Sequence, residues 1–267
     1  MLPHQLPTNQ PPTTGGVARC SVDAAGLRFA VTGAAGLIGR RLVANFAAAG
    51  AEVLALDHAE VSLTEAAQRW PSTVRPIVVD LADPVAIERL ADDPDFGAVN
   101  VLVNNAAVTY LRDPLLDTTA TTLDLIHAVN YRATVLLSQL VVRRWQAVGS
   151  SGCIINISSP GAARAHEDQA AYDASKGAIE AITRAMAVEW GRLGVRVNAL
   201  APASVGDGRR AVTDAPLGWS ATGDDVAAAS LWLASDAAVI VTGHVLALDG
   251  GLLARLRTAT EHERTPA

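Results

Sequence analysis

The chain has 267 residues, and 50% of them are hydrophobic, so one large α/β domain is able to bury a full core. The net charge is −6 and no basic cluster is interleaved with aromatic residues, which argues against a nucleic-acid partner. We find no apolar run approaching the roughly 20 residues that span a bilayer, and expect no membrane partner. The two cysteines, Cys20 and Cys153, do not make a disulfide framework and fit a reducing cytoplasm.

Strand and helix patterns alternate along most of the sequence. Residues 1–26 are rich in proline and glycine and predict a flexible leader. Predicted strands lie at 27–31, 52–56, 75–79, 99–103, 152–157, 195–200 and 239–248. Predicted helices lie at 37–49, 62–70 behind a Ser62 capping box, from Asp83-Pro84, from Thr118 or Thr119 to 145, at 170–190, and at 222–234 behind Thr222.

The predicted strands are mostly continuous Val/Ile/Leu runs, which suit a parallel sheet buried on both faces. Alternation with helices then indicates a doubly wound, seven-stranded α/β sheet in a single domain, residues 27–251, with a C-terminal tail at 252–267. Cys153 falls in an apolar strand pattern, which favours a core position over a nucleophile. No Cys/His cluster has metal-ligand spacing, so no metal site is predicted.

A glycine pattern, Thr-Gly-x-x-Gly-x-x-Gly, joins the first predicted strand to the first predicted helix, from Thr32 to Gly39. Such a turn lets backbone approach a dinucleotide pyrophosphate at a helix N-terminus; the alternative is an ordinary tight turn. Asp57 ends the second strand. A carboxylate there accepts ribose hydroxyls and repels a 2′-phosphate, which favours NAD over NADP, unless Asp57 is merely a polar strand end.

Tyr172 and Lys176 lie four positions apart on the predicted helix 170–190 and therefore share one face. A phenol has a pKa of about 10, and a neighbouring ammonium lowers that value by favouring the phenolate. Lys176 is the only lysine among the 21 Lys and Arg residues. Arginine does not replace a compact ammonium of perturbable pKa, so the pair indicates proton transfer and not an ordinary surface helix.

These motifs, taken in order, resemble the short-chain dehydrogenase/reductase family over about residues 27–251, and the resemblance implies a Rossmann-type fold. Further landmarks are Asp80-Leu81, Asn104-Asn105-Ala106, Asn130, Ser159, Arg196-Val197-Asn198-Ala199 and Asp249-Gly250-Gly251. The resemblance implies that Tyr172 exchanges a proton with the substrate oxygen, and that Lys176 lowers the Tyr172 pKa and holds the nicotinamide ribose. It also implies that Ser159 donates a hydrogen bond to the reacting oxygen and that Asn130 holds a proton-relay water. Ser158 is the competing serine; family spacing favours Ser159.

The same resemblance implies a set of cofactor-binding residues. They are Thr32, Gly33, Ala35, Gly36, Leu37, Ile38, Gly39, Asp57, Asp80, Leu81, Asn104, Ala106, Tyr172, Lys176 and Pro202.

Four departures from the family pattern stand out. Leu37 occupies the usual place of the second glycine, a spacing that looks like the family's longer epimerase and dehydratase branch. Ala107 replaces a glycine, and Pro202-Ala203 replaces Pro-Gly without the threonine that usually follows. The lid segment 202–216 is also short, so the site is either more open or closed by another part of the chain.

The resemblance predicts an NAD(H)-dependent oxidoreductase that interconverts a secondary alcohol and a ketone on a small polar substrate. A lyase or epimerase that keeps NAD bound is the alternative, and a non-catalytic dinucleotide-binding regulator is a third. Arg209 and Arg210 either bind an acidic substrate group or, more simply, are solvated. Apolar surface on helix 118–145, with the small residues of the Tyr172 helix, predicts a homotetramer or homodimer.

Overall fold

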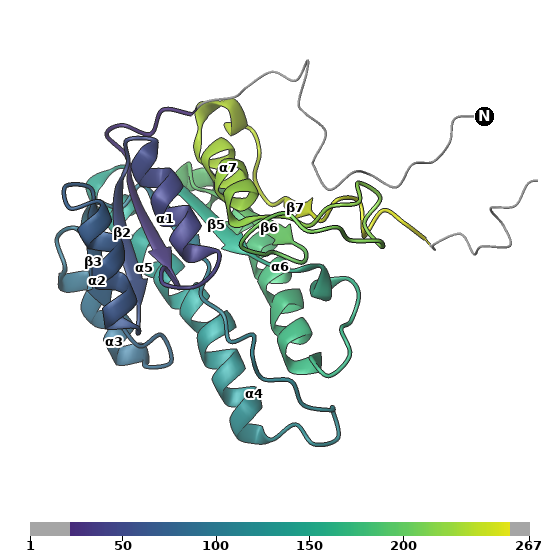
Figure 1. The fold of residues 1–267 in the computed structure, drawn as a ribbon. Coiled ribbons are helices and arrows are strands. Elements are labelled where there is room, and N and C mark those ends of the chain that lie inside the picture. The colour runs from purple at the N-terminus through teal and green to yellow at the C-terminus, as the bar shows by residue number, and fades with distance from the viewer. Residues whose placement is uncertain (1–21, 257–267) are drawn as a thin grey trace, which may run out of the picture.

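The computed structural model describes residues 22–256, and most of the predicted leader, Cys20 and most of the tail lie outside that range. Its sheet is seven-stranded and wholly parallel, in the order β3-β2-β1-β4-β5-β6-β7 (Figure 1). The predicted fold class is therefore confirmed. The strands are β1 (Arg28–Thr32), β2 (Glu52–Asp57), β3 (Val74–Val78), β4 (Val101–Asn104), β5 (Cys153–Ile157), β6 (Arg196–Pro202) and β7 (Val245–Leu248).

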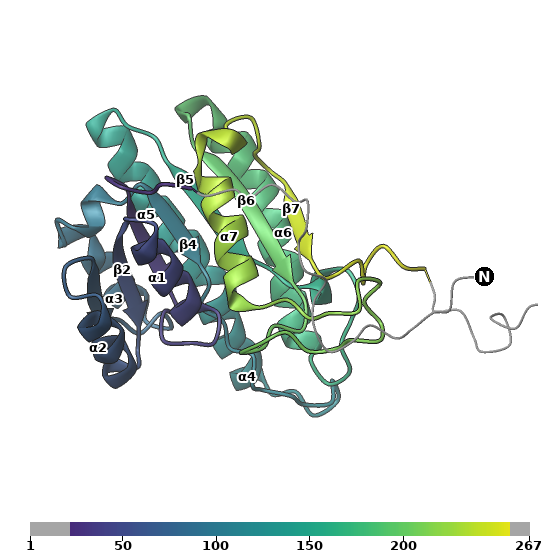
Figure 2. The same ribbon diagram turned by 45° about the horizontal axis from the view of Figure 1, so that its top comes forward.

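Helices cover both faces of the sheet and bury two apolar layers (Figure 2). One face packs against α1 (Gly39–Ala48), α2 (Glu60–Arg69) and α7 (Gly223–Ala234). The other packs against α3 (Pro84–Arg89), α5 (Ala133–Val148) and α6 (Ala170–Trp190). Central strands such as β4 and β5 are buried along their whole length, as continuous apolar runs between two helical layers should be. Short 3₁₀ turns lie at Leu90–Asp92, Phe96–Ala98, Pro160–Ala162, Gly191–Leu193 and Asp236–Ala238.

Three of the predicted helix starts are confirmed by side-chain caps. Asp83 accepts a hydrogen bond from the Val85 N–H at the start of α3. Thr119 accepts one from the Thr122 N–H at the start of α4 (Ala120–Ile126). Thr222 forms a capping box with Asp225 at α7. Each cap satisfies a backbone donor that the first helical turn leaves unpaired.

The capping box predicted at Ser62 is wrong. Helix α2 begins two residues earlier, at Glu60, and its N-cap Ala59 makes no side-chain cap. The reason is the preceding strand end: the Asp57 carboxylate accepts the Ala59 N–H at 3.1 Å and turns the chain before Ser62 is reached.

The last predicted strand, 239–248, is also wrong in its first half. Val239 and Val241 donate their N–H groups to Asp236 and Ala238 in successive turns, and Gly243 has a φ of +74°. Only Val245–Leu248 pairs with β6. Apolar residues that are exposed in a turn imitate a strand in the sequence, which explains the error.

The long helix predicted up to residue 145 is interrupted. Helices α4 and α5 are joined by a π-helical turn, His127–Arg132, which sequence periodicity does not reveal. By length and composition the helix Ala120–Val148 contains an 18-residue stretch apolar enough to cross a membrane, so our expectation of no such run was too strict. Half of that stretch is buried inside the molecule, and the core helix of a globular domain has the same composition. Leu137, Val141 and Val142 belong to that core, so the predicted self-association through this helix stays a prediction.

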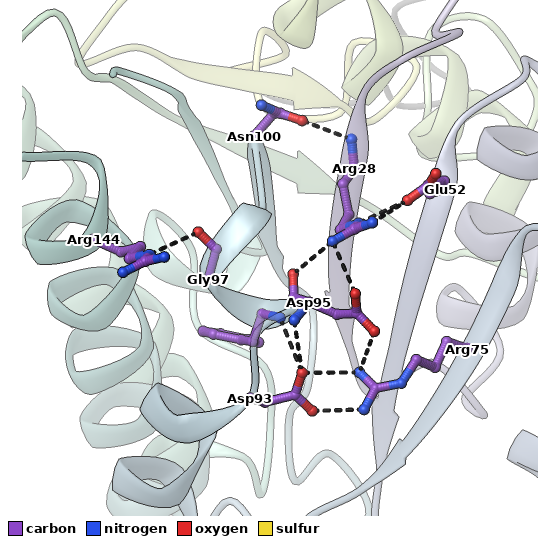
Figure 3. A network of polar contacts seen from close by, with 9 residues as sticks. Arg28, Glu52, Arg75, Asp93, Asp95, Gly97, Asn100 and Arg144 are labelled. Carbon is purple, nitrogen blue, oxygen red and sulfur yellow. Dashed lines mark hydrogen bonds and ion pairs between the residues drawn. The ribbon is translucent and has the colours of Figure 1, made fainter. Parts of the chain in front are cut away.

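A charged network joins the amino ends of the first three strands (Figure 3). Arg75 donates two parallel hydrogen bonds to Asp93, at 3.1 and 2.7 Å. Asp95 lies 3.3 Å from Arg75 and 3.2 Å from Arg28, which also binds Glu52. This network fixes the edge of the sheet opposite to the one at which the glycine turn lies.

We expect Arg75→Ala to lower the free energy of unfolding by roughly 0.5–1 kcal/mol at pH 7, the range of partly exposed ion pairs. The hydrogen bonds from Arg75 lower the pKa of Asp93. A lowered folded-state pKa contributes stability above the unfolded value of about 3.9 and loses it as the pH falls through the folded value. Urea unfolding should therefore show a difference between parent and variant that shrinks from pH 7 toward pH 3. Arg143→Ala, at an exposed position on α5, is the control; a pH-independent difference would contradict the assignment.

Candidate active site

A cleft of about 880 Å³ opens at the carboxyl edge of the sheet. It is bordered by residues at or just after the ends of β1, β2, β5 and β6, among them Gly33, Asp57, Ile157 and Pro202. The sheet order runs one way from β1 to β3 and the other way from β4 to β7. Ligands of open α/β sheets bind at this switch point, so the cleft lies where a dinucleotide is expected.

Thr32 and Asn105 lock the two strands at the switch point. The Thr32 hydroxyl accepts the N–H groups of Asn105 and Ala106, at 2.9 and 3.0 Å, and donates to the Val103 carbonyl. The Asn105 amide donates to the Thr32 and Gly33 carbonyls, at 2.9 and 3.1 Å. The phosphate turn is therefore held rigidly against the segment after β4.

Two glycines of this turn leave no room for a side chain. Gly33 has a φ of +63°, and a Cβ there would lie 2.8 Å from the Ala106 Cα. A Cβ on Gly39 would lie 1.9 Å from the Gly33 carbonyl oxygen. At Gly36 the only near atom is the Gly33 oxygen, at 3.2 Å. Gly33 and Gly39 thus serve the closure of the turn, while Gly36 borders the cleft.

Asp57 is 8% exposed and accepts two backbone hydrogen bonds. Its Oδ2 accepts the Ala35 N–H from the phosphate turn at 3.0 Å, and its Oδ1 accepts the Ala59 N–H at 3.1 Å. A carboxylate has about four acceptor positions, so acceptor capacity remains for a ligand in the cleft.

Lys176 and Tyr172 project from α6 toward the cleft wall, and both line it. Lys176 is 3% exposed, and its ammonium donates to the Ile157 carbonyl at 2.7 Å and lies 5.5 Å from the centroid of the Tyr172 ring. Burial lowers the pKa of Lys176 to about 8. The ammonium therefore keeps most of its charge at pH 7, with two N–H donors unused by Ile157.

The pKa of Tyr172 does not follow the expectation drawn from the sequence. Burial raises it above the ordinary value, the Ser159 hydroxyl opposes that shift by hydrogen bonding, and the negative charge of Asp173 adds to it. Desolvation of the phenolate outweighs the help of the protein's own neighbours. The arrangement therefore favours the protonated form of the Tyr172 phenol.

Ser159 and Ser158 leave β5 in different directions. Ser159 Oγ accepts the Gly161 N–H at 3.1 Å, which leaves its hydroxyl hydrogen for another acceptor. Ser158 Oγ donates to the Glu180 carboxylate on α6 at 3.0 Å, although the residue also borders the cleft. This geometry favours Ser159 as the serine that faces a ligand, in line with its spacing from Tyr172.

Asn130 lies in the π turn, behind the wall of the cleft. Its side chain accepts the Val108 N–H at 2.7 Å and donates to Ser175 Oγ at 3.0 Å. Ser175 in turn donates to the Tyr172 carbonyl at 2.6 Å. Asn130 thus ties the segment after β4 to the helix that carries Tyr172 and Lys176.

The cleft brings together most of the residues predicted to form the site. Those that line it are Gly33, Ala35, Gly36, Leu37, Ile38, Asp57, Asp80, Leu81, Ala106, Ser159, Tyr172, Lys176 and Pro202. Those that do not are Thr32, Gly39, Asn104 and Asn130. These four shape the wall from behind, Asn104 through buried hydrogen bonds to Ser138 and Asn156.

The arginines suggested for substrate binding point elsewhere. Neither Arg209 nor Arg210 lines the cleft. Arg209 donates to the Asp225 carboxylate at 2.5 Å, and Asp207 pairs with Arg40, so the short lid is pinned to α7 and α1. Sequence reasoning missed Arg112 and Gln169, which do line the cleft and belong to no motif.

Cys153 is confirmed as a core residue. It is buried in β5, and burial raises the pKa of its thiol to about 11. Among residues 22–256 no group of three or more His, Cys, Asp or Glu side chains is placed to hold a metal ion.

An open parallel sheet with a glycine-lined cleft at its switch point defines the class of dinucleotide-binding α/β proteins. The family model described as enoyl-(acyl carrier protein) reductase matches residues 33–253. The chain is 38% identical over 242 residues to L-xylulose reductase of Bos taurus, covering 86% of this chain and 98% of that protein. It is 37% identical over 238 residues to galactitol 2-dehydrogenase (L-tagatose-forming) of Cereibacter sphaeroides, covering 83% and 93%.

A solved structure of a putative NAD(P)-dependent gluconate 5-dehydrogenase from Beutenbergia cavernae, with bound NADP at low occupancy, aligns with a TM-score of 0.80. Its sequence is 35% identical, and the alignment covers 88% of this chain and 100% of that one. The chain belongs to the short-chain dehydrogenase/reductase family. This is a family of oxidoreductases that bind a nicotinamide dinucleotide, NAD or NADP.

We expect Gly39→Ala to destabilise the protein by about 3 kcal/mol or more, because the new Cβ meets fixed backbone at the phosphate turn. Thermal unfolding and titration with NAD, followed by fluorescence, should both show the loss. Gly191→Ala is the matched control: nothing lies within 4 Å of its Cβ and its φ is −58°, so stability should stay within about 1 kcal/mol. Equal stability of the two variants would show that the turn relaxes.

Proposed function

We propose that the protein is an NAD(H)-dependent oxidoreductase that interconverts a secondary alcohol and a ketone on a small polar substrate. The observation that carries the proposal is the convergence of Ser159, Tyr172 and Lys176 on the wall of the cleft at the switch point. A protein that only sensed a dinucleotide would need no proton donor beside the Lys176 ammonium.

The cleft fits a dinucleotide. Gly33 and Gly36 have no side chain to cover the backbone that precedes α1, so a pyrophosphate is able to approach it closely. The N–H groups and the dipole at the start of α1 favour such an anion. We propose that the remaining Lys176 donors hold a ribose hydroxyl; in support, the Ile157 carbonyl uses only one of the three N–H groups. When bound, the nicotinamide supplies the hydride acceptor or donor.

The chain's own residues supply the proton and its orientation. Tyr172 gives its phenolic proton to a carbonyl oxygen that becomes an alcohol, and takes it back in the reverse direction. Ser159 donates its hydroxyl hydrogen to the same oxygen and stabilises charge that develops there. Asn130 makes the hydrogen bonds that hold helix α6 to the loop after β4, and we propose that a water beside it returns the proton to solvent.

The substrate class follows from the lining and from the relatives. Thr109, Arg112, His166 and Gln169 give the outer cleft a polar wall. L-xylulose and galactitol appear in the names of relatives that are 38% and 37% identical. We therefore assign a polyol or a ketose as the substrate.

A lyase or epimerase that keeps NAD bound is the second candidate, and it rests on the sequence alone, where the glycine spacing with Leu37 looks like the family's epimerase and dehydratase branch. The two activities differ in net redox change. Net appearance of NADH, followed by absorbance with a panel of polyols, supports the oxidoreductase; conversion of substrate without any NADH signal supports the alternative.

NAD is the proposed cofactor because the Asp57 carboxylate borders the cleft, where a 2′-phosphate would meet its charge. The Beutenbergia cavernae structure holds NADP at low occupancy, so NAD and NADP are the two cofactors to compare directly.

Tyr172→Phe should lower kcat at least about 100-fold, the usual scale of general acid–base catalysis, while NAD still binds. Turnover is measured by NADH absorbance and binding by fluorescence. Tyr131→Phe is the matched control, because that phenol lies outside the cleft lining, and should leave both unchanged. A Tyr172→Phe enzyme within tenfold of the parent would remove Tyr172 as the proton donor.

Asp57→Ala should narrow the preference for NAD over NADP by about tenfold or more, because the charge that repels a 2′-phosphate is removed. The ratio of kcat/KM for the two cofactors is the measurement. Asp57→Asn removes the charge but keeps an acceptor for the Ala35 N–H, so it separates repulsion from loss of turn structure. Asp124→Ala, exposed and outside the cleft, is the control. An unchanged ratio in both Asp57 variants would exclude Asp57 as the selector.

A further inference from the structure

His166 and Asp173 form a clamped pair beside Tyr172 that the proposed reaction does not use. The His166 N–H donates to Asp173 Oδ2 at 2.6 Å, and His166 Nδ1 lies 2.8 Å from Asp173 Oδ1. The two contacts use both carboxylate oxygens, and Asp173 is 7% exposed. The buried Asp173 side chain of α6 thus fixes both the backbone and the ring of His166.

Gly161 makes the room for this pair. A Cβ on Gly161 would lie 2.0 Å from Asp173 Oδ1 and 2.9 Å from His166 Cε1. Ser159 holds the Gly161 N–H, so the turn that passes over the pair starts from the candidate catalytic serine. The arrangement is built from two segments of the chain, and both touch the active site.

The clamp also selects the tautomer of the imidazole. An ionised carboxylate only accepts hydrogen bonds, so His166 Nδ1 carries the hydrogen that faces Asp173. In the neutral ring, Nε2 is then an acceptor, and it is the ring nitrogen left for a ligand.

His166 lines the cleft, and its ring centroid is 6.5 Å from that of Tyr172. The two side chains therefore line the same part of the cleft, so a ligand that contacts Tyr172 is within reach of His166. The negative charge of Asp173 also raises the pKa of Tyr172, which favours the protonated phenol. Asp173 therefore acts on both neighbours, and it orients His166 through its two carboxylate contacts.

We propose that His166 Nε2 accepts a hydrogen bond from a second substrate hydroxyl, on the carbon beside the reacting one, with Asp173 as its positioning residue. The site then selects vicinal diols and α-hydroxyketones over simple secondary alcohols and ketones. This inference rests on the proposed function and assigns His166 as the residue that recognises the second hydroxyl of a polyol or ketose.

The test compares 3-hydroxybutan-2-one with butan-2-one, which differ by that one hydroxyl, in the full-length enzyme with NADH. The parent should prefer the hydroxyketone in kcat/KM by about tenfold or more, the effect of one hydrogen bond in a partly open site. His166→Ala should remove that preference by slowing the hydroxyketone alone. His127→Ala, an exposed histidine outside the cleft, is the matched control and should behave as the parent.

Asp173→Asn, with nearly the same shape, separates orientation from packing. It should raise KM for the hydroxyketone more than for butan-2-one, because the ring is no longer held in one tautomer. A parent without preference, or a His166→Ala variant that loses activity on both ketones equally, overturns the inference. A parent that reduces neither these ketones nor any polyol-derived ketose overturns the proposed function instead.

Discussion

The buried Lys176 ammonium is the interaction on which the candidate site depends. A charge removed from water costs several kcal/mol unless it is compensated, and burial here lowers the pKa of Lys176 to about 8. The compensation comes from the Ile157 carbonyl at the end of β5 and from the face of Tyr172. Because the carbonyl belongs to the sheet and the ammonium to α6, the packing of that helix on β5 sets the position of both catalytic groups.

A polar network under the cleft fixes that packing. Asn156, near the carboxyl end of strand β5, donates to Thr183 of α6 at 2.9 Å and accepts from Asn104 of β4 at 2.9 Å. Asn104 also donates to Ser138 of α5. Buried networks of this kind allow few alternative registers, because a shift would break these hydrogen bonds and leave more polar groups unpaired than the Asn104 Oδ1 that already lacks a partner. The network therefore holds two strands and two helices in one relative position directly behind Tyr172 and Lys176.

Sequence patterns predicted well what local chemistry or long periodicity decides. Helix α6 has the predicted bounds 170–190, and Asp83, Thr119 and Thr222 cap their helices as expected. The patterns failed where contacts between segments determine the secondary structure. The Asp57 carboxylate binds the Ala59 N–H, so helix α2 begins before Ser62, and the apolar run at Val239 forms hydrogen-bonded turns instead of a strand. They also missed the raised pKa of Tyr172, because desolvation depends on what covers the phenol. The sequence also did not predict the His166–Asp173 contact, because His166 lies in a loop, where a separation of seven residues does not indicate which side chains meet.

The glycine spacing illustrates how a departure from a family pattern is weighed once contacts are known. The turn needs a bare backbone where a Cβ would strike fixed atoms, and both such positions, Gly33 and Gly39, are retained. Leu37 is 38% exposed and lines the cleft, so the side chain added there changes the cleft wall and leaves the turn closed. A shifted second glycine therefore bears on how a dinucleotide is contacted and does not by itself argue for a different reaction. The groups that bear on the reaction lie elsewhere on the cleft wall, where Ser159, Tyr172 and the clamped His166 converge and where we propose that the substrate binds.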